Sequence, residues 1–323
     1  MTLIEDLAVE EGVGVSDDTG WHTLLARISN LSVTRHFDAY ADVDWDNPDF
    51  AIDPADGRWA LTAADSLGAT AWYQSLPAET QARLGIDLTA SMMKIGLQFE
   101  NVLKQGLLRF AAELPNRSPE FRYAYHEVIE EAQHSLMFQE FVNRSGFDAA
   151  GLSWSDRLGA RFVTTLGSRF PPLFFVFVLG GEDPIDHVQR QELRRDDLPP
   201  LLERIMRIHV TEEARHLSFA RHYLKRTVPA LGRLRRAELG IGAPLILGVM
   251  ASMMLTPSRQ MVARYQIPKD VLDGAYRHNP EARAEMLASL RKVRLLCEEL
   301  GLLTPAYRRL WKALGLWETA PAR

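Results

Sequence analysis

The chain contains 323 residues, of which 46% are hydrophobic and 24% are charged, so it is long enough for one large or two small domains. Its 37 Lys and Arg residues and 42 Asp and Glu residues give a net charge of −5, which argues against a nucleic-acid or anionic-membrane partner. Cys297 is the single cysteine. An internal disulfide, a zinc ribbon and an iron–sulfur cluster are therefore excluded. The acidic N-terminus MTLIEDLAVEEG does not resemble a signal peptide, and we expect a cytoplasmic protein.

The hydrophobic pattern predicts an all-α chain, because apolar residues recur every three or four positions and no alternating strand of useful length is found. Ser16, Asp17, Asp18 and Thr19 offer caps for the first helix. The residues 42–58 are rich in Asp, Asn and Pro and are expected to form a loop. The expected helices cover residues 21–40, 87–114, 120–143, 171–195, 200–227, the apolar run from 239, and 281–300.

Local signals mark the helix that is expected to begin near Glu120. Ser118 is a suitable N-cap, and Pro119 stands at the first helical position, where its missing N–H costs nothing. Gly146 is suited to the end of the same helix. With no Gly- or Ser-rich linker, we expect a single domain over residues 1–323, with N-terminal helices in 1–86, a central bundle in 87–228 and C-terminal helices in 229–323.

The apolar run LGIGAPLILGVMASMMLT spans residues 239–256 without a charge. Eighteen residues are the lower limit for a membrane span. The run contains three Gly and one Pro and is followed by Pro257, Ser258 and Arg259, so a helix buried on all sides of a helical bundle explains it better.

Two Glu-x-x-His pairs suggest a metal site. Glu131 with His134 and Glu213 with His216 each place a carboxylate and an imidazole on one helix face. A single pair of this kind is expected by chance. The two pairs, however, are each preceded by a Glu at 31 residues, Glu100 and Glu182, so the whole trio recurs with an offset of 82.

This internal repeat predicts a ferritin-like four-helix bundle with additional helices. In such a bundle, lone Glu residues and Glu-x-x-His pairs from four helices meet at the axis and bind two metal ions. Carboxylates and imidazoles suit iron, with manganese as an alternative. His209, four residues before Glu213, would add a third imidazole; its counterpart in the first half is Glu127, either an acceptor for a ligand or a solvated or salt-bridged acid.

Several of the candidate residues could instead have a purely structural role. Glu182 is the weakest candidate, because Gly180, Gly181 and Pro184 surround it and it could instead be a turn acid or an N-cap. His126, His187 and His222 have no partner in the repeat and are expected to be structural. Tyr123 and Tyr125 could line the site or pack in the core. The run FPPLFFVFV at 170–178 could line an apolar pocket, but core packing is the preferred interpretation.

These residues resemble the p-aminobenzoate N-oxygenase family of ferritin-like di-iron oxygenases. The resemblance implies that two irons are bound by four Glu and three His, with no catalytic residue assigned beyond these ligands. By motif, the ligands would be Glu100, Glu131, His134, Glu182, His209, Glu213 and His216.

The resemblance also implies that O2 is used to oxidise an aromatic amine to a hydroxylamine, nitroso or nitro product. No complete nicotinamide or flavin fingerprint is present, since Gly12 with Gly14 and Gly240 with Gly242 lack the third Gly. Electrons would then come from a separate reductase or ferredoxin. The sequence departs from the family where an arginine before the first Glu holds the substrate carboxylate, because here only Lys94 is available.

Three alternatives remain open at this point. The same metal pair could serve a desaturase or hydroxylase that acts on an acyl or carrier-tethered substrate. The chain could bind or store iron without further catalysis, or it could be a helical interaction protein whose Glu and His lie on its surface. A small-molecule substrate and O2 are the expected partners, and a homodimer is a further possibility.

Overall fold

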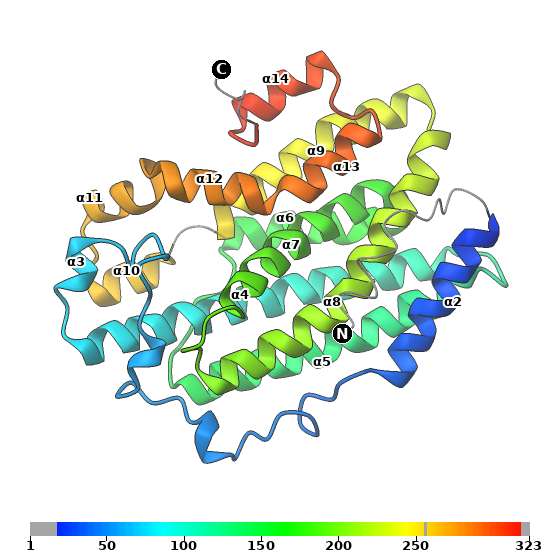
Figure 1. Ribbon diagram of the computed structural model, residues 1–323. Coiled ribbons are helices and arrows are strands. Elements are labelled where there is room, and N and C mark those ends of the chain that lie inside the picture. Colours follow the sequence, from blue (N-terminus) through cyan, green and yellow to red (C-terminus); the bar gives the residue numbers. More distant parts are fainter. Residues whose placement is uncertain (1–17, 255–256, 318–323) are drawn as a thin grey trace.

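The computed structural model describes residues 18–254 and 257–317, except for the side chains of 251–254. The described residues form helices and short helical turns, with no strand among them (Figure 1). The predicted all-α class is confirmed. Ser16 and Asp17, the residues 255–256 of the apolar run, and the acidic N-terminal stretch lie outside the described residues.

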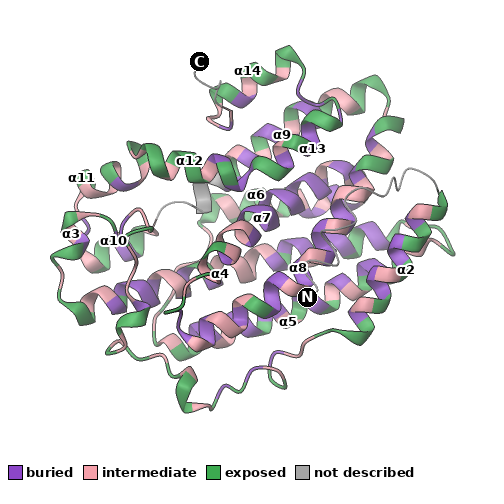
Figure 2. Ribbon diagram, in the orientation of Figure 1, coloured by how far each residue is buried: buried purple, intermediate pink, exposed green. Residues whose placement is uncertain are grey.

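Four long helices form the centre of the molecule. They pack as two consecutive hairpins, α4 with α5 and α7 with α8, and the hairpins contact each other through α4 with α7 and α5 with α8. Their inward faces hold most of the buried residues of the chain, shown in purple in Figure 2. This arrangement is the predicted four-helix bundle. Its helices are α4 (Ala78–Ala112), α5 (Pro119–Ser145), α7 (Pro171–Glu192) and α8 (Pro200–Thr227).

Proline and glycine define the ends of these helices as expected. Pro119 and Pro200 occupy first-turn positions of α5 and α8, where a proline fits without loss of a hydrogen bond. Gly146 ends α5 with a φ of 72°, a left-handed conformation that glycine adopts without strain. Ser118 is the residue before α5, but its side chain makes no capping hydrogen bond; it donates instead to Glu120.

Two helices cover the bundle on opposite sides of the ligand-bearing hairpins. Helix α2 (Asp18–Thr34) is shorter than the predicted 21–40 and buries Trp21 and Leu25 against α5 and α8. Helix α6 (Trp154–Arg169) was not predicted; a capping box of Ser153 and Asp156 starts it. It packs on α4 so closely that a Cβ on Gly167 would lie 2.0 Å from the backbone oxygen of Gly106.

The remaining elements are short, and two sequence predictions need correction here. The predicted loop 42–58 contains two 3-10 turns, and the predicted helix 281–300 is interrupted at Leu290, where α12 ends and α13 begins. The connecting elements before α4 are η1 (Pro48–Phe50), η2 (Gly57–Trp59) and α3 (Ala71–Gln74). After α8 follow η3 (Val228–Ala230), α9 (Arg233–Met254), α10 (Arg259–Tyr265), α11 (Lys269–Leu272), η4 (Asp273–Arg277), α12 (Pro280–Ser289), α13 (Arg291–Glu299) and α14 (Pro305–Ala313).

The apolar run forms most of α9, but it is not buried on all sides. One face, with Leu239 and Leu247, packs against the body of the protein, whereas Ile241, Leu245 and Val249 are exposed. The reason is its position: α9 lies outside the bundle, and its main contacts are with α7 and α14. In the described part of the chain, no helix combines the length and the apolar character that crossing a membrane requires.

Candidate metal centre

All seven predicted ligands lie inside the four-helix bundle. Helix α4 contributes one of them, α5 two, α7 one and α8 three. None of their side chains is more than 2% exposed. The seven residues are Glu100, Glu131, His134, Glu182, His209, Glu213 and His216.

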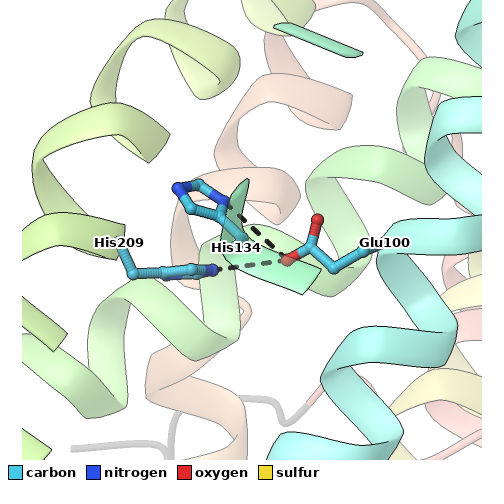
Figure 3. A group of neighbouring side chains, drawn as sticks. All are labelled: Glu100, His134 and His209. Atoms are coloured by element: carbon cyan, nitrogen blue, oxygen red, sulfur yellow. Dashed lines mark ion pairs between the residues drawn. The ribbon is translucent and has the colours of Figure 1, made fainter. Parts of the chain in front are cut away.

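Glu100, His134 and His209 form the first group, which Figure 3 shows with the three side chains pointing toward one another from three helices. Oε1 of Glu100 lies 3.9 Å from Nδ1 of His134 and 3.6 Å from Nε2 of His209. A ligand atom of each residue lies within 4.8 Å of the others. This spacing allows the three atoms to surround one ion.

The other predicted ligands adjoin the first group through Glu213. Glu131, Glu213 and His216 form a second group, and Glu182, His209 and Glu213 a third, by the same 4.8 Å criterion. Oε1 of Glu213 lies 3.1 Å from Nδ1 of His216, 3.5 Å from Nδ1 of His134 and 3.7 Å from Nε2 of His209. The structure therefore brings all seven predicted residues together in one cluster.

Glu182 points into the cluster because α7 continues through the Gly and Pro residues around it. Gly181 leaves room for a neighbouring ring, since a Cβ there would lie 2.0 Å from the ring of Phe99. Gly180 likewise accommodates Leu247 of α9. Pro184 stands inside the helix without ending it. The turn and N-cap interpretations of Glu182 are wrong, because the helix runs from Pro171 to Glu192.

Each histidine of the cluster is held by an acceptor on another helix, and the sequence reasoning missed these acceptors. Nε2 of His134 lies 2.9 Å from Oε2 of Glu212, and Nε2 of His216 lies 2.8 Å from Oε2 of Glu130. Such partners fix the orientation of a ligating imidazole and leave its other nitrogen for a metal. The sequence repeat could have indicated them, because Glu130 and Glu212 are separated by the same 82 residues as the two trios.

His209 is oriented in the same manner by an amide. Its Nδ1 lies 2.9 Å from Oε1 of Gln189 on α7, so Nε2 faces Glu100 and Glu213. The residue 82 positions before Gln189 is Leu107, so the repeat gives no indication of this partner.

The buried Arg215 contacts both of the carboxylates that hold the histidines, Glu130 and Glu212. Nη2 of Arg215 donates to Oε1 of Glu130 at 2.7 Å and to Oε1 of Glu212 at 3.4 Å. Its side chain and that of Glu212 are fully buried, and that of Glu130 is 2% exposed. Burial alone would raise the pKa of Glu130, but the contacts with His216 and Arg215 lower it to about 2. His216, together with Arg215, thus keeps this acceptor ionised.

The seven predicted ligands are buried close to one another, and this shifts the pKa values of several of them. Burial and the neighbouring Glu213 and Glu131 raise the pKa of Glu182 well above its usual range. Burial disfavours a charged His134, yet its contacts with Glu131 and Glu212 raise its pKa to about 10. The centre therefore favours positive charge, whether a proton or a metal ion supplies it. Burial lowers the pKa of His209 to about 4, so this imidazole is neutral and able to ligate at neutral pH.

The donor set fits a pair of divalent cations. Among the described residues, Oε2 of Glu100, Oε1 of Glu182 and Oε2 of Glu213 have no hydrogen-bond partner although they are buried. Oε1 of Glu131 lies 3.0 Å from His216, without the geometry of a hydrogen bond. Buried carboxylate oxygens of this kind need a cation or a proton. Four carboxylates and three imidazoles without a thiolate suit iron or manganese.

Glu127 departs from both of its sequence interpretations. It is fully buried, and neither of its oxygens has a hydrogen-bond partner within the described part of the chain. Burial raises its pKa to about 8, so the side chain is predominantly protonated at neutral pH. It is therefore not a solvated acid, and it is also absent from the three close groups.

The other histidines and tyrosines considered from the sequence lie outside the cluster. His187 pairs with Glu285, His222 contacts the backbone oxygen of Ser218, and His126 contacts Arg122. Their expected structural character agrees with these contacts. Tyr123 is fully buried against Phe219, and Tyr125 is largely exposed.

Aromatic side chains lie beside Glu182, between α4 and α7. The rings of Phe99 and Phe177 lie 4.9 Å apart next to Gly181. The aromatic run 170–178 is mostly buried in the main core, as its preferred interpretation stated. Lys94, which stands near the position of the substrate arginine in the similar family, donates to Oε1 of Gln139 at 2.8 Å. The ammonium group of Lys94 is therefore hydrogen-bonded to a side chain of α5.

Comparison with known proteins agrees with this geometry. The sequence profile described as P-aminobenzoate N-oxygenase AurF matches residues 18–301. Two similar proteins are the uncharacterized protein Rv0885 of Mycobacterium tuberculosis and the uncharacterized protein Mb0909 of Mycobacterium bovis. Each is 39% identical over 299 residues, which cover 92% of this chain and 88% of the relative.

Proposed function

The chain belongs to the p-aminobenzoate N-oxygenase AurF family, and from this membership we propose that it is a di-iron oxygenase that oxidises the nitrogen of an aromatic amine with O2. The resemblance stated from the motifs is confirmed, and the family indicates an oxygenase. One observation carries the proposal: three imidazoles and four carboxylates from four helices meet inside the bundle.

In this proposal, the seven clustered residues are the ligands of two iron ions. Glu100, His134 and His209 would hold one ion. Glu131, Glu213 and His216 would hold the other, and Glu182 adjoins them through Glu213. The ions, when bound, supply the chemistry of O2 activation.

The remaining residues of the site orient and protect this centre. Glu212 and Glu130 keep a proton on Nε2 of His134 and His216, so that Nδ1 of each ring presents its lone pair to the cluster. Burial of the cluster, together with the rings of Phe99, Phe138 and Phe177, keeps bulk water away. Exclusion of water strengthens each electrostatic contact in the centre.

The rings of Phe99 and Phe177 beside the cluster would suit an aromatic substrate. Because Lys94 is held by Gln139, we propose that it does not serve the substrate carboxylate as the family's arginine does. The amine substrate of this chain would then either lack a carboxylate or have it bound by a residue other than Lys94. We also propose a single domain over 1–323, a cytoplasmic location, and an external reductase or ferredoxin as electron donor.

The test begins with metal content. Anaerobic loading with ferrous iron should give about two irons per chain for the natural protein. The variant Glu182→Gln should retain its helix content by circular dichroism and lose a large part of its iron. Glu203→Gln on the same bundle, at a partly exposed site outside the cluster, is the matched control and should bind iron as the natural protein does. Equal iron binding by all three proteins would contradict the assigned ligands.

The reaction is tested next with the ferrous protein, a chemical reductant, ¹⁸O2 and a panel of arylamines. The label should appear in a hydroxylamine, nitroso or nitro product, while the second oxygen atom is reduced to water with two electrons and two protons. If every amine yields only water or hydrogen peroxide, N-oxygenation is wrong. Labelled hydroxylation or desaturation of an acyl substrate would instead establish the rival chemistry.

A further inference from the structure

Three buried polar residues next to the metal cluster have side-chain atoms without a partner. They are Tyr123 and Glu127 on α5 and Arg215 on α8, and all three are fully buried. Among the residues that the structure describes, nothing makes a hydrogen bond with the hydroxyl of Tyr123, with either carboxylate oxygen of Glu127, or with Nε and Nη1 of Arg215. Unpaired polar atoms are costly in a protein interior, and buried water molecules are what usually satisfies them.

The packing of α5 against α8 places these atoms close to one another. Tyr123 and Glu127 are one turn apart on the same face of α5. The ring of Tyr123 lies 4.7 Å from that of Phe219, and Phe219 is one turn after Arg215 on the same face of α8. The three polar side chains therefore lie between α5 and α8, with Glu127 one turn before the predicted ligand Glu131.

The sequence repeat places Glu127 beside the second group of ligands as it places His209 in the first. The two residues are 82 positions apart, and each stands four residues before the Glu of a Glu-x-x-His pair. Nε2 of His209 lies 3.6 Å from Oε1 of Glu100 in the first group. Glu127, in contrast, belongs to none of the three close groups. It is thus placed as a neighbour of the metal centre rather than as a ligand.

Both acidic groups of this site hold a proton at neutral pH. Burial raises the pKa of Glu127 to about 8, while His216 opposes this shift and Glu213 adds to it. Burial also raises the pKa of the Tyr123 hydroxyl well above its usual value. A protonated carboxyl group and a hydroxyl can each donate to a water molecule, and so can the free N–H groups of Arg215. The carboxyl group of Glu127 is the one that releases its proton most readily.

We propose that Glu127, Tyr123 and Arg215 bound a buried water site, and that Glu127 delivers protons through this water to the metal centre. The inference rests on the proposed function, in which one oxygen atom of O2 becomes water with two protons and two electrons from the external donor. In each transfer, the O–H bond of the Glu127 carboxyl group breaks and its proton passes to the water. The water gives one of its own protons to the oxygen atom that is being reduced. The carboxylate then takes up a proton from solvent.

The burial of the centre explains why it needs such a residue. None of the predicted ligands is more than 2% exposed, so bulk water does not supply protons directly. A carboxyl group that is held close to the centre, protonated and free of other hydrogen bonds is suited to this task.

Infrared spectroscopy tests the proton on Glu127 without any turnover. The difference between the spectra of the natural protein and Glu127→Gln should contain the carbonyl band of a protonated carboxylic acid, both without metal and after loading with ferrous iron. Glu140→Gln is the control on the same helix, where Glu140 pairs with the partly exposed Arg144, and it should leave the band unchanged. If the band disappeared on iron loading, Glu127 would be an eighth ligand. If it were missing from the metal-free protein, Glu127 would be ionised. Either result would overturn the proposal.

The rate of O2 consumption by the ferrous protein with a chemical reductant tests proton delivery. This reduction takes up protons whether or not an amine is oxidised, so a failure of N-oxygenation does not affect the test. Glu127→Gln should keep its helix content and about two irons per chain but consume O2 about 100-fold more slowly, which is a usual contribution of a proton donor. Glu127→Asp retains an acid and should recover part of the rate, and Glu140→Gln should match the natural protein.

Two results would refute proton delivery by Glu127. One is an equal rate for the natural protein and Glu127→Gln, and the other is an equal loss in Glu127→Gln and Glu127→Asp. If the natural protein bound iron and consumed no O2, the proposed function itself would be wrong.

Discussion

Replacing Arg215 by Met should strongly destabilise the apoprotein. The guanidinium is fully buried and contacts Glu130 at 2.7 Å and Glu212 at 3.4 Å. Met retains most of the side-chain volume but leaves two buried carboxylates without their cation. Removal of one partner from a buried ion pair typically costs about 3–5 kcal/mol. With an unfolding entropy of about 2.1 cal/mol/K per residue, the Tm should fall by about 4–7 °C.

The matched control is Arg207→Met on the same helix. Arg207 pairs with Glu203 at 2.6 Å, but the two side chains are 57% and 41% exposed, and a pair of this kind contributes below about 0.5 kcal/mol. Thermal unfolding of the metal-free proteins, followed by circular dichroism, measures both changes. The reasoning would be refuted if the two variants lost the same small amount of stability. Adding Glu130→Gln to Arg215→Met should restore part of the loss, because it removes one of the unpaired charges.

Three further predictions concern the ligands, the packing and the pH dependence. His209→Ala should lower iron content toward one per chain at limiting iron, and an unchanged content and metal spectrum would remove this residue from the ligand set. Gly181→Ala should cost about 1–3 kcal/mol, because its Cβ would meet the ring of Phe99. Gly274→Ala, with no atom within 4 Å, should not, and equal effects in chemical denaturation would disprove the packing argument. Burial raises the pKa of Cys297 to about 12, so the native state holds a proton that the unfolded state loses. Above pH 9 the natural chain should lose about 1.4 kcal/mol per pH unit more than Cys297→Ala, and parallel denaturation curves would contradict this.

The ligand-bearing helices could be predicted because their burial follows the helical period and their ends carry proline or glycine. Helix α8 matches its predicted bounds, and α5 differs by one or two residues. Helix α6 could not be predicted in this way. Its apolar residues Trp154, Leu158 and Phe162 point outward, and its contact with α4 depends on glycines, which have no hydrophobic signal.

The candidate ligands were predictable for a different reason. Six of them repeat across the chain as two trios with one offset, and His209 lies four residues before Glu213, so the pattern is visible without any structure. The supporting residues were harder to find, since Glu130, Glu212 and Arg215 are charged residues in amphipathic helices and are expected to face solvent. Only the packing of α5 against α8 shows that these charges neutralise one another inside the bundle. Gln189 could not have been found from the repeat at all.

The hydrogen bonds between α5 and α8 are reciprocal: His134 of the first hairpin is held by Glu212 of the second, and His216 of the second by Glu130 of the first. Neither hairpin supplies the carboxylate that orients the imidazole of its own Glu-x-x-His pair. Two identical hairpins related by a half-turn would satisfy each other in the same manner. The orientation of both imidazoles therefore depends on the two hairpins being packed together, and a hairpin displaced from its partner would lose it.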